Sequence, residues 1–281
     1  MSQRRQLQQR LAGQAEIGEI LTSMKNLAYM ETRKLARLLR SQRRVVERIE
    51  AIAADFLTFY PELLPAAETP QRIYLVLGSR RGLCGDFNAR LVSALQAELA
   101  QRGERDDLII AVGQKLCQRL TPLPTRRVEL AGSDVAEEIP EVMKGIVREL
   151  DRQPRQVMDA LLVFYHSDPN QPPCRQQLLP PFITTSKGPP AAGFPPLLNL
   201  QPQKFLLGLI EQYLYAVLHA VLYRSLAAEN EQRIRHLDGA VHHLEERSAE
   251  LQRRIRGLRQ EEIIEEIEVI LLNAADLGEP R

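Results

Sequence analysis

Hydrophobic and polar positions follow a heptad spacing in the first part of the chain. Residues 1–58 contain no proline and only two glycines, and mostly apolar residues recur from Leu35 at alternating steps of four and three. This spacing is that of the seam of a coiled coil, so the sequence predicts one long helix. The seam positions are Leu35, Leu39, Gln42, Val46, Ile49, Ala53 and Phe56.

The last part of the chain shows the same spacing. Residues 203–277 contain no proline, and a second seam shifts its phase once before it resumes as an apolar stripe near the end. The seam positions are Leu237, Val241, Leu244, Ser248, Leu251, Ile255 and Leu258, followed after the shift by Ile263, Ile267 and Ile270. A domain of this size needs no helix that long for its own core, so we expect the two terminal helices to pair as an antiparallel rod.

The middle of the chain, residues 71–200, has a different pattern. Short apolar runs alternate with helix-like segments, which is typical of an α/β layer with a mostly parallel sheet. The expected strands are 72–78, 108–112, 126–130, 159–166 and one near 175–184, and the expected helices are 87–102, 113–120 and 133–152. The predicted organisation is therefore an N-terminal coiled-coil helix (1–58), a Rossmann-like α/β domain (71–200) and a C-terminal coiled-coil helix (203–277).

Composition narrows the function classes. Aromatic residues make up 5% of the chain and tryptophan is absent, which favours aliphatic helix packing over an aromatic ligand pocket. Three widely spaced cysteines indicate neither a disulfide framework nor a zinc site. The longest nearly apolar run, residues 213–223, is too short to cross a bilayer, so no direct membrane insertion is expected.

The stretch "SRRGLCGDFN" (79–88) is the main candidate for chemistry. It follows a strand and precedes a helix, but it lacks the GxxxxGK[ST] and GxGxxG patterns of nucleotide loops. Cys84 as a nucleophile would need a histidine, and four of the five histidines lie in the expected rod. The sequence favours a tight turn in which Gly82 and Gly85 adopt unusual backbone angles. We expect no catalytic residue, no cofactor and no tight ATP binding.

The simplest interpretation of two charged features of the sequence is that they lie on solvated surfaces. Adjacent His242 and His243 point about 100° apart on a helix and cannot chelate one metal together, so no metal site is expected. Residues 1–50 hold eleven Arg or Lys against five acids, but they lack the aromatic residues or groove-reading motif of a nucleic-acid binder. The first interpretation of this basic helix is a solvated face of a coiled coil, and the second is a contact with an acidic protein partner.

Taken together, the three pieces resemble the gamma subunit of F-type ATP synthases. The turn resembles the family's "SDRGLCGxxN" pattern, and the N-terminal helix matches the family at Arg10, Met24, Ala28 and Lys34, among others. Further matches at the C-terminal end are Glu229, Arg233, Leu237, Arg259, Gln260, Ile263, Glu266, Ile270 and Ala274. The resemblance covers nearly the whole chain. Departures from the pattern at Arg80, Glu31, Ile264, Val269 and Asn273 indicate a divergent branch, for which the alternative, sodium-type F-ATPases are a candidate.

The resemblance implies a non-catalytic central-stalk rotor subunit that couples ion translocation to ATP synthesis or hydrolysis. Its implied partners are the alpha and beta subunits of the catalytic hexamer, an epsilon subunit and the membrane rotor ring, on the cytoplasmic side of a bacterial inner membrane. The implied stator contacts, or catch, are Arg233, Arg259 and Gln260. The implied bearing is Ile263, Ile267, Ile270 and Leu271, with Met24 as a contact of the N-terminal helix and Arg81, Gly82, Cys84 and Gly85 as the turn of the foot domain.

Two other classes remain open from the residues alone. One is a coiled-coil scaffold or adaptor whose basic helix binds nucleic acid or an acidic protein; salt-sensitive DNA binding by the isolated chain would favour it. The other is a Rossmann-like enzyme with helical extensions, which lacks a loop to hold its cofactor. Copurification with a nucleotide-binding hexamer would favour the rotor.

Overall fold

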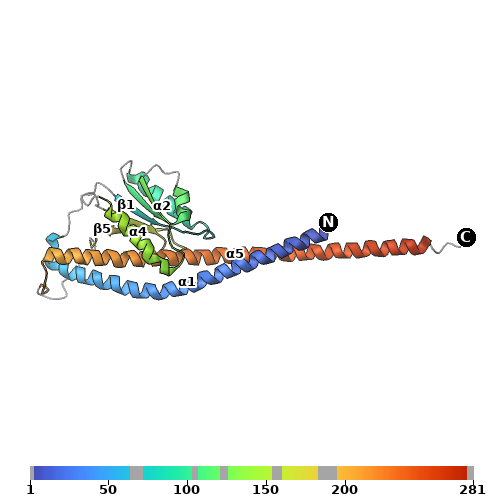
Figure 1. Ribbon diagram of the computed structural model, residues 1–281, viewed down its shortest axis with the longest axis horizontal. Coiled ribbons are helices and arrows are strands. Elements are labelled where there is room, and N and C mark those ends of the chain that lie inside the picture. Colours follow the sequence, from blue (N-terminus) through green and yellow to red (C-terminus); the bar gives the residue numbers. More distant parts are fainter. Residues whose placement is uncertain are drawn as a thin grey trace. The chain divides into compact units, whose positions relative to one another are not determined.

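The computed structural model divides the chain into two compact units. Unit 1 combines Met1–Leu27 with Arg235–Arg281, and unit 2 is Ala28–Ile234 (Figure 1). The structure describes residues 3–63, 72–102, 107–120, 126–153, 160–182 and 195–276, with side chains up to residue 271 in the last range. Two helices, α1 (Gln3–Phe59) and α5 (Pro202–Asp276), contribute residues to both units.

Unit 2 contains a five-stranded sheet in the order β3-β2-β1-β4-β5. Strands β1 to β4 run parallel to one another, and β5 runs antiparallel to β4. The strands are β1 (Arg72–Leu77), β2 (Leu108–Val112), β3 (Arg126–Leu130), β4 (Ala160–Tyr165) and β5 (Cys174–Leu179). The predicted α/β fold with a mostly parallel sheet is thus confirmed.

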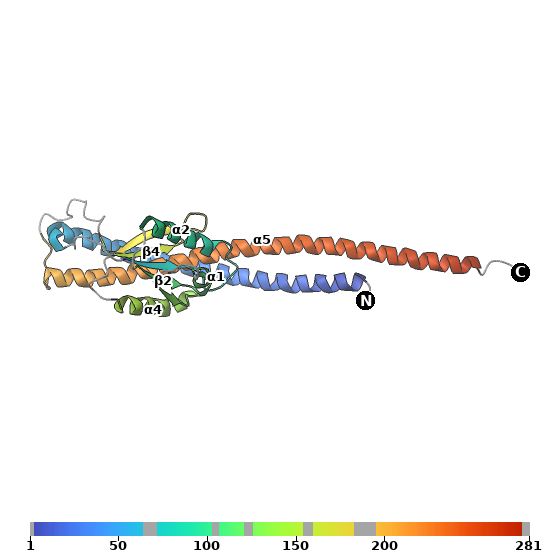
Figure 2. The same ribbon diagram turned by 90° about the horizontal axis from the view of Figure 1, so that it is seen from above.

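Helices cover both faces of this sheet, which explains why the strands are continuous apolar runs rather than alternating ones. Tyr74 and Val76 of β1 face a core with α2 (Phe87–Arg102) and α3 (Gln114–Leu120). Ile73, Leu75 and Leu77, one residue out of phase, face a second core with α4 (Ile139–Asp151) and the long helices. Figure 2 shows α2 and α4 on opposite sides of β2 and β4.

The long helices supply part of the core of unit 2. The predicted seam of α1 is confirmed as a buried stripe, because Leu35, Ala53 and Phe56 are at most 1% exposed and lie in the core beneath the sheet. The rings of Phe56, near the end of α1, and Phe205, near the start of α5, lie 4.9 Å apart. Figures 1 and 2 show the two helices side by side beyond this contact, so they run antiparallel within this unit. By length and composition alone α5 also contains a stretch that could cross a membrane, of which 44% is buried inside the protein.

Unit 1 is an antiparallel pair of helices. Arg4 pairs with Glu262 at 3.2 Å, Gln14 with Ser248 at 3.0 Å and Lys25 with Asp238 at 2.9 Å, so residue numbers fall along α5 as they rise along α1. The predicted seam residues of α5 from Val241 to Leu258 are half-buried, while the residues between them are mostly exposed. The expected antiparallel coiled coil is confirmed for this unit.

Two element boundaries differ from the sequence prediction by more than two residues. The helix expected from residue 133 begins as a 3-10 turn at Ala136–Glu138, and α4 follows from Ile139 with a proline in its first turn, a position where the missing N–H does no harm. The strand expected to reach 184 ends at Leu179, because the prolines that follow cannot donate to the ladder. Residues 183 and 184 lie outside the described ranges.

Candidate functional site at the glycine-cysteine turn

The backbone between β1 and α2 forms the expected tight turn. Gly85 has a φ of 59° and Leu83 a φ of 63°, both in the left-handed region that glycine adopts more readily than other residues. The prediction for Gly85 is therefore confirmed. That for Gly82 is wrong: the left-handed angle belongs to Leu83, and Gly82 contributes its carbonyl oxygen instead.

Side chains inside the turn are bonded to one another. Asn88 at the start of α2 accepts a hydrogen bond from the Ser79 amide at 2.9 Å and donates one to the Ser79 hydroxyl at 2.7 Å. The Cys84 thiol, 3% exposed, donates to the same hydroxyl at 3.4 Å. Burial raises the pKa of Cys84, which disfavours the reactive thiolate. Cys84 thus acts as a structural residue of the turn.

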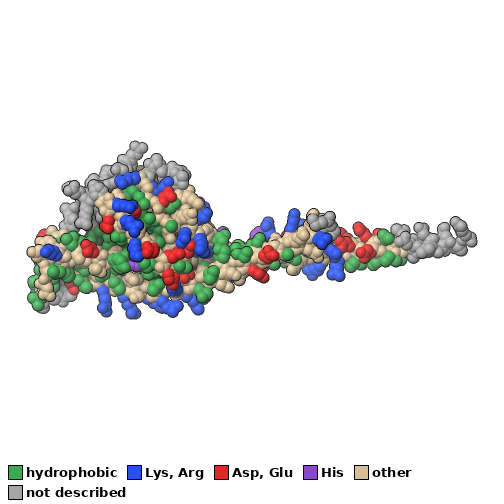
Figure 3. Space-filling model, viewed as in Figure 1, with side chains coloured by type: hydrophobic (Ala, Val, Ile, Leu, Met, Phe, Trp, Pro, Cys, Tyr) green, Lys and Arg blue, Asp and Glu red, His purple; other side chains and the backbone are tan. Residues whose placement is uncertain are grey.

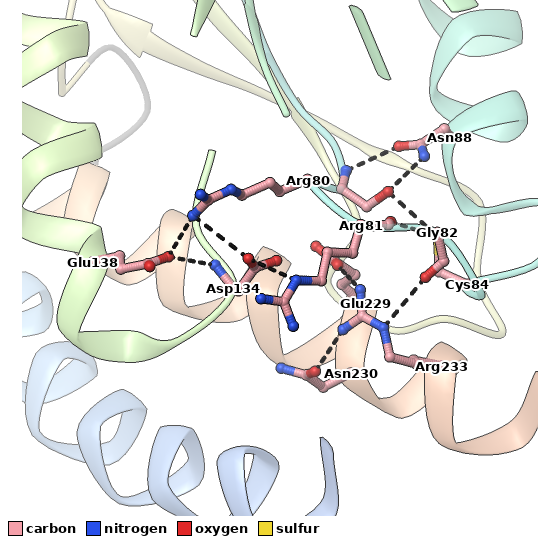
Figure 4. A network of polar contacts seen from close by, with 11 residues as sticks. Arg80, Arg81, Gly82, Cys84, Asn88, Asp134, Glu138, Glu229, Asn230 and Arg233 are labelled. Carbon is pink, nitrogen blue, oxygen red and sulfur yellow. Dashed lines mark hydrogen bonds and ion pairs between the residues drawn. The ribbon is translucent and has the colours of Figure 1, made fainter. Parts of the chain in front are cut away.

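The turn is held to α5 by a buried polar group. Arg233 donates to the Gly82 carbonyl at 3.4 Å and to the Asn230 side chain at 2.8 Å, and it pairs with Glu229 one turn earlier (Figure 4). All three side chains on α5 are at most 6% exposed. Burial raises the pKa of Glu229 to about 7, against the opposing attraction of Arg233. Removing one partner of such a buried pair typically destabilises a protein by about 3–5 kcal/mol.

A second set of contacts joins the turn to the segment before α4. Arg81 pairs with Asp134 at 3.0 Å, and Arg80 reaches both Asp134 at 3.5 Å and Glu138 at 3.1 Å (Figure 4). Glu138 also accepts a hydrogen bond from the Asp134 amide at 2.8 Å, which together with Arg80 lowers the pKa of Glu138. Arg80 is one of the departures from the family pattern, and here it has two acidic partners.

Helix α1 completes the arrangement. Glu31 accepts a hydrogen bond from the amide of Ala136 at 2.6 Å, and Lys34 pairs with Glu137. Glu31 is another departure from the pattern, so two departures contact the same segment, 134–138. We call these polar contacts among α1, the turn 79–88, residues 134–138 and residues 229–233 the clasp.

The clasp positions backbone segments rather than performing a reaction. It contains a buried thiol, a buried carboxylate paired with an arginine and several ion pairs, but none of its described members combines a nucleophile with a histidine base. Its effect is mechanical, because the turn cannot move relative to α5, α1 or residues 134–138 without breaking several charge-assisted hydrogen bonds.

The structure brings one group of the predicted site residues together. Arg81, Gly82, Cys84 and Gly85 lie in the turn, and Arg233 contacts that turn directly. The stator contact predicted for Arg233 stays a prediction, since the partners of its guanidinium among the described residues, Gly82, Asn230 and Glu229, all lie within unit 2.

The remaining predicted residues lie in unit 1. Arg259 and Gln260 are exposed on α5, and Met24 of α1 is half-buried. The apolar bearing residues have exposed fractions of 46% for Ile263, 50% for Ile267, 65% for Ile270 and 63% for Leu271. In the register set by Arg4 and Glu262, Ile263 lies level with Gln3, and no described residue of α1 lies opposite Ile267, Ile270 or Leu271.

Sequence reasoning missed most acidic members of the clasp. No sequence pattern pointed to Asp134 or Glu138 as site residues, because their partners are far away in the chain. Glu229 and Arg233 did carry one: they stand four residues apart, the spacing of a helical ion pair, in a segment with alanines and leucines beside them. The two adjacent histidines lie exposed on α5, where His242 is within 3.4 Å of Glu246, and the described residues contain no cluster of three metal ligands.

Comparison with known proteins identifies sequence relatives along the whole chain. A family model described as ATP synthase matches residues 3–277. The ATP synthase gamma chain of Heliobacterium modesticaldum is 26% identical over 294 residues, covering 98% of this chain and 99% of that one. The ATP synthase gamma chain of Clostridium botulinum (strain Loch Maree) is 22% identical over 272 residues, covering 94% and 95%.

Solved structures share the fold. A chain of the Euglena gracilis mitochondrial ATP synthase rotor superposes with a TM-score of 0.60 at 18% identity, covering 92% of this chain and 98% of that one. A chain from the central stalk and c-ring of Tetrahymena thermophila mitochondrial ATP synthase gives a TM-score of 0.59 at 16% identity, covering 79% and 99%. The sequence matches favour the rotor over the scaffold, the adaptor and the Rossmann-like enzyme.

Proposed function

Since the chain belongs to the ATP synthase gamma-chain family, we propose that it works as the central-stalk rotor subunit of an F-type ATP synthase, coupling ion flow to ATP synthesis or hydrolysis. The match over residues 3–277 is the observation that carries this function. The proposed partners are the alpha and beta subunits of a catalytic hexamer, a membrane rotor ring and an epsilon subunit. The proposed location is the cytoplasmic side of a bacterial inner membrane, as a peripheral component.

In this proposal the helical pair of unit 1 turns inside the hexamer and the ATP chemistry belongs to the partners. A shaft with different side chains on its different faces contacts each catalytic subunit differently in turn. Such differential contact energy is what shifts a subunit between states of different nucleotide affinity. The clasp supports the role of unit 2, because it ties the α/β domain to both long helices and so lets torque pass between them.

The proposed stator contact lies at Arg259 and Gln260, which are exposed on α5. Their hydrogen bonds to a catalytic subunit can be replaced by water on release, and each bond to a charged group contributes about 1.5–3 kcal/mol. This is enough to favour one rotary position without locking the shaft. Arg233 has the additional task of holding the turn, through its bond to Gly82.

The proposed bearing consists of Ile263, Ile267, Ile270 and Leu271. Each is about half exposed or more in the isolated chain. Apolar side chains gathered at one end of a helix mark a surface that another protein covers. An apolar sleeve also permits rotation, because it offers no directional hydrogen bonds that would have to break at every step.

The test is the double change Arg259→Ala and Gln260→Ala in the assembled complex. We expect normal assembly and a several-fold lower coupled turnover. The matched control is Gln252→Ala with Arg253→Ala, an exposed pair of the same composition on the same helix. Wild-type turnover and ion pumping in the first variant would show that Arg259 and Gln260 make no stator contact.

A further inference from the structure

A cavity lies in unit 2 between the two long helices and the part of the sheet formed by β4 and β5. Its volume is about 390 Å³, within the range of about 300–1,000 Å³ that is typical of small-molecule pockets. One wall is apolar: Val217 and Val221 of α5 are at most 4% exposed, and Leu39 and Val46 of α1 pack against the same core. We call this space the interhelix cavity. It offers an aliphatic surface beside several charged groups.

The end of the interhelix cavity that lies toward the C-terminus of α1 is acidic. Glu47 and Glu50 line it, and Glu50 is half-buried. Burial raises the pKa of Glu50, and the nearby carboxylate of Glu47 raises it further. Arg43 pairs with Glu47 at 2.7 Å, whereas Glu50 has no ion-pair partner among the described residues. A cation placed beside Glu50 would offset both unfavourable effects.

The opposite end of the cavity is basic. Arg224 of α5 is half-buried near Tyr165, and its positive charge opposes the rise in the pKa of Tyr165 that burial causes. Tyr165 itself donates a hydrogen bond to Gln176 at 3.0 Å. Within the described ranges Arg224 has no acidic partner. A guanidinium binds a carboxylate through two parallel hydrogen bonds, so a ligand carboxylate suits this end.

Many other charged side chains of unit 2 are balanced by a neighbour. Figure 3 shows basic and acidic side chains side by side around α4, where Lys144 pairs with Glu141 at 2.8 Å and Lys34 of α1 pairs with Glu137. Glu50 differs from these residues, because the opposite charge that lines the same cavity does not reach it. The cavity therefore holds two separated charges that a ligand could pair with.

The antiparallel register explains why the two charges do not meet. Phe205 lies beside Phe56, so Glu50, about six residues before Phe56, is level with a position about six residues after Phe205. Arg224 lies about 13 residues further along α5, which corresponds to a rise of about 20 Å. Side chains that reach toward each other across this span leave about 10 Å between their charges. A ligand that bonds to both must therefore be extended.

We propose that the interhelix cavity binds a small, extended zwitterion whose ammonium group pairs with Glu50, whose carboxylate pairs with Arg224 and whose aliphatic middle packs on the valines between them. Such a ligand contacts α1 and α5 at once, so it stabilises unit 2 by an amount that grows with the ligand concentration. The site goes beyond the proposed rotor function, because it takes a small molecule rather than a subunit of a complex.

NMR titration of small-molecule probes with the purified chain tests the ligand class. The probes are 8-aminooctanoate, whose two charges lie about 10 Å apart when it is extended, and octanoate and octylamine, which carry one charge each. We expect a Kd below about 1 mM for 8-aminooctanoate and binding about tenfold weaker for each single-charge probe. A Kd above about 10 mM for 8-aminooctanoate, or equal binding of either single-charge probe, overturns the proposal.

Two charge variants assign the ends of the ligand. Glu50→Gln should weaken binding of 8-aminooctanoate about tenfold and leave octanoate unchanged, and Arg224→Gln should weaken 8-aminooctanoate about tenfold and leave octylamine unchanged. The matched controls are Glu141→Gln and Arg148→Gln, at exposed sites of α4 outside the cavity. Equal losses in the controls would show a general attraction to the charged surface, and no loss in either cavity variant would show that neither charge is used; both results overturn the proposal.

A cavity-filling variant separates binding in the cavity from binding on the surface. Ala220 lines the cavity and is half-buried, so Ala220→Leu fills part of it without changing any charge. Binding of all three probes should fall in this variant, while urea unfolding followed by tyrosine fluorescence shows that unit 2 remains folded. If Ala220→Leu does not fold, Val46→Phe fills the cavity from α1 instead. Unchanged binding in a folded variant overturns the proposal.

The site and the rotor function fail separately. A chain that joins a nucleotide-binding hexamer but binds none of the probes leaves the rotor function intact and excludes the site. A chain that binds 8-aminooctanoate in the cavity but joins no hexamer keeps the site and excludes the rotor function.

Discussion

Replacing Glu229 with Gln should make the stability of unit 2 less dependent on pH. Folding raises the pKa of this carboxyl from 4.5 to about 7, chiefly because Glu229 is buried. A group whose pKa is raised by folding binds its proton more tightly in the folded chain. Its stabilising contribution is therefore complete below pH 4.5 and is lost as the pH rises through about 7.

The magnitude follows from the two pKa values. One pKa unit corresponds to about 1.4 kcal/mol, so ionisation of Glu229 lowers the free energy of unfolding by about 2–3 kcal/mol between about pH 5 and pH 8. Glu229→Gln cannot ionise but can still accept the hydrogen bond from Arg233. The difference in stability between wild type and variant should therefore shift by that amount over this range, in favour of the variant at high pH.

Tyrosine fluorescence during urea unfolding measures this difference selectively. The chain has seven tyrosines and no tryptophan, and every tyrosine lies between residues 29 and 223, within unit 2. Glu47→Gln, at the exposed Glu47 of the Arg43 ion pair, is the control for a carboxylate-to-amide change on a helix surface. A difference for Glu229→Gln that stays constant within about 0.5 kcal/mol from about pH 5 to pH 8 would refute the reasoning, because Glu229 would then be ionised throughout.

Three further changes test other parts of the structure. Cys84→Ser should keep coupled ATPase activity within about threefold, because a hydroxyl can donate to Ser79 as the thiol does; a loss beyond about tenfold in the purified complex would contradict this. Ile267→Asp should leave the thermal unfolding of the isolated chain unchanged, because Ile267 is 50% exposed, but should lower the yield of assembled complex; an equal yield would contradict the bearing. Gly85→Ala should lower the free energy of unfolding by about 1–2 kcal/mol, measured by urea titration, because φ there is 59°, and an unchanged midpoint would contradict that strain.

Much of the fold could be predicted because burial leaves a direct record in the sequence. A strand covered on both faces must be apolar throughout, and "IYLVL" (73–77) is such a run. The heptad seams likewise report which side of each long helix is buried. They do not report what covers it: in unit 2 Leu35 and Phe56 pack in the core beneath the sheet as well as near α5. The spacing of apolar residues shows which face of a helix is buried, but the elements that pack against that face are known only from the folded structure.

The clasp could not be predicted, because a sequence pattern does not show which distant residues contact one another. Its contacts join residues far apart in the chain, such as Glu31 and the amide of Ala136, which are 105 positions apart. Many of its acceptors and donors are backbone groups, like the carbonyl of Gly82, and every residue type carries these. Family resemblance pointed to the turn and to Arg233, but only the folded chain shows that they touch.

The polar pair in the seam of unit 1 has a consequence for how the shaft bears load. Gln14 and Ser248 bond at 3.0 Å among otherwise mostly aliphatic seam residues of α5. If α5 slid past α1 by one heptad, Gln14 would face Val241 or Ile255, and the loss of this half-buried hydrogen bond would cost about 0.5–1.5 kcal/mol. Twist applied to two helices wound around each other is lost when one helix slides along the other. The hydrogen bond between Gln14 and Ser248 at a seam position opposes such sliding, and so helps the helical pair keep its register under torque.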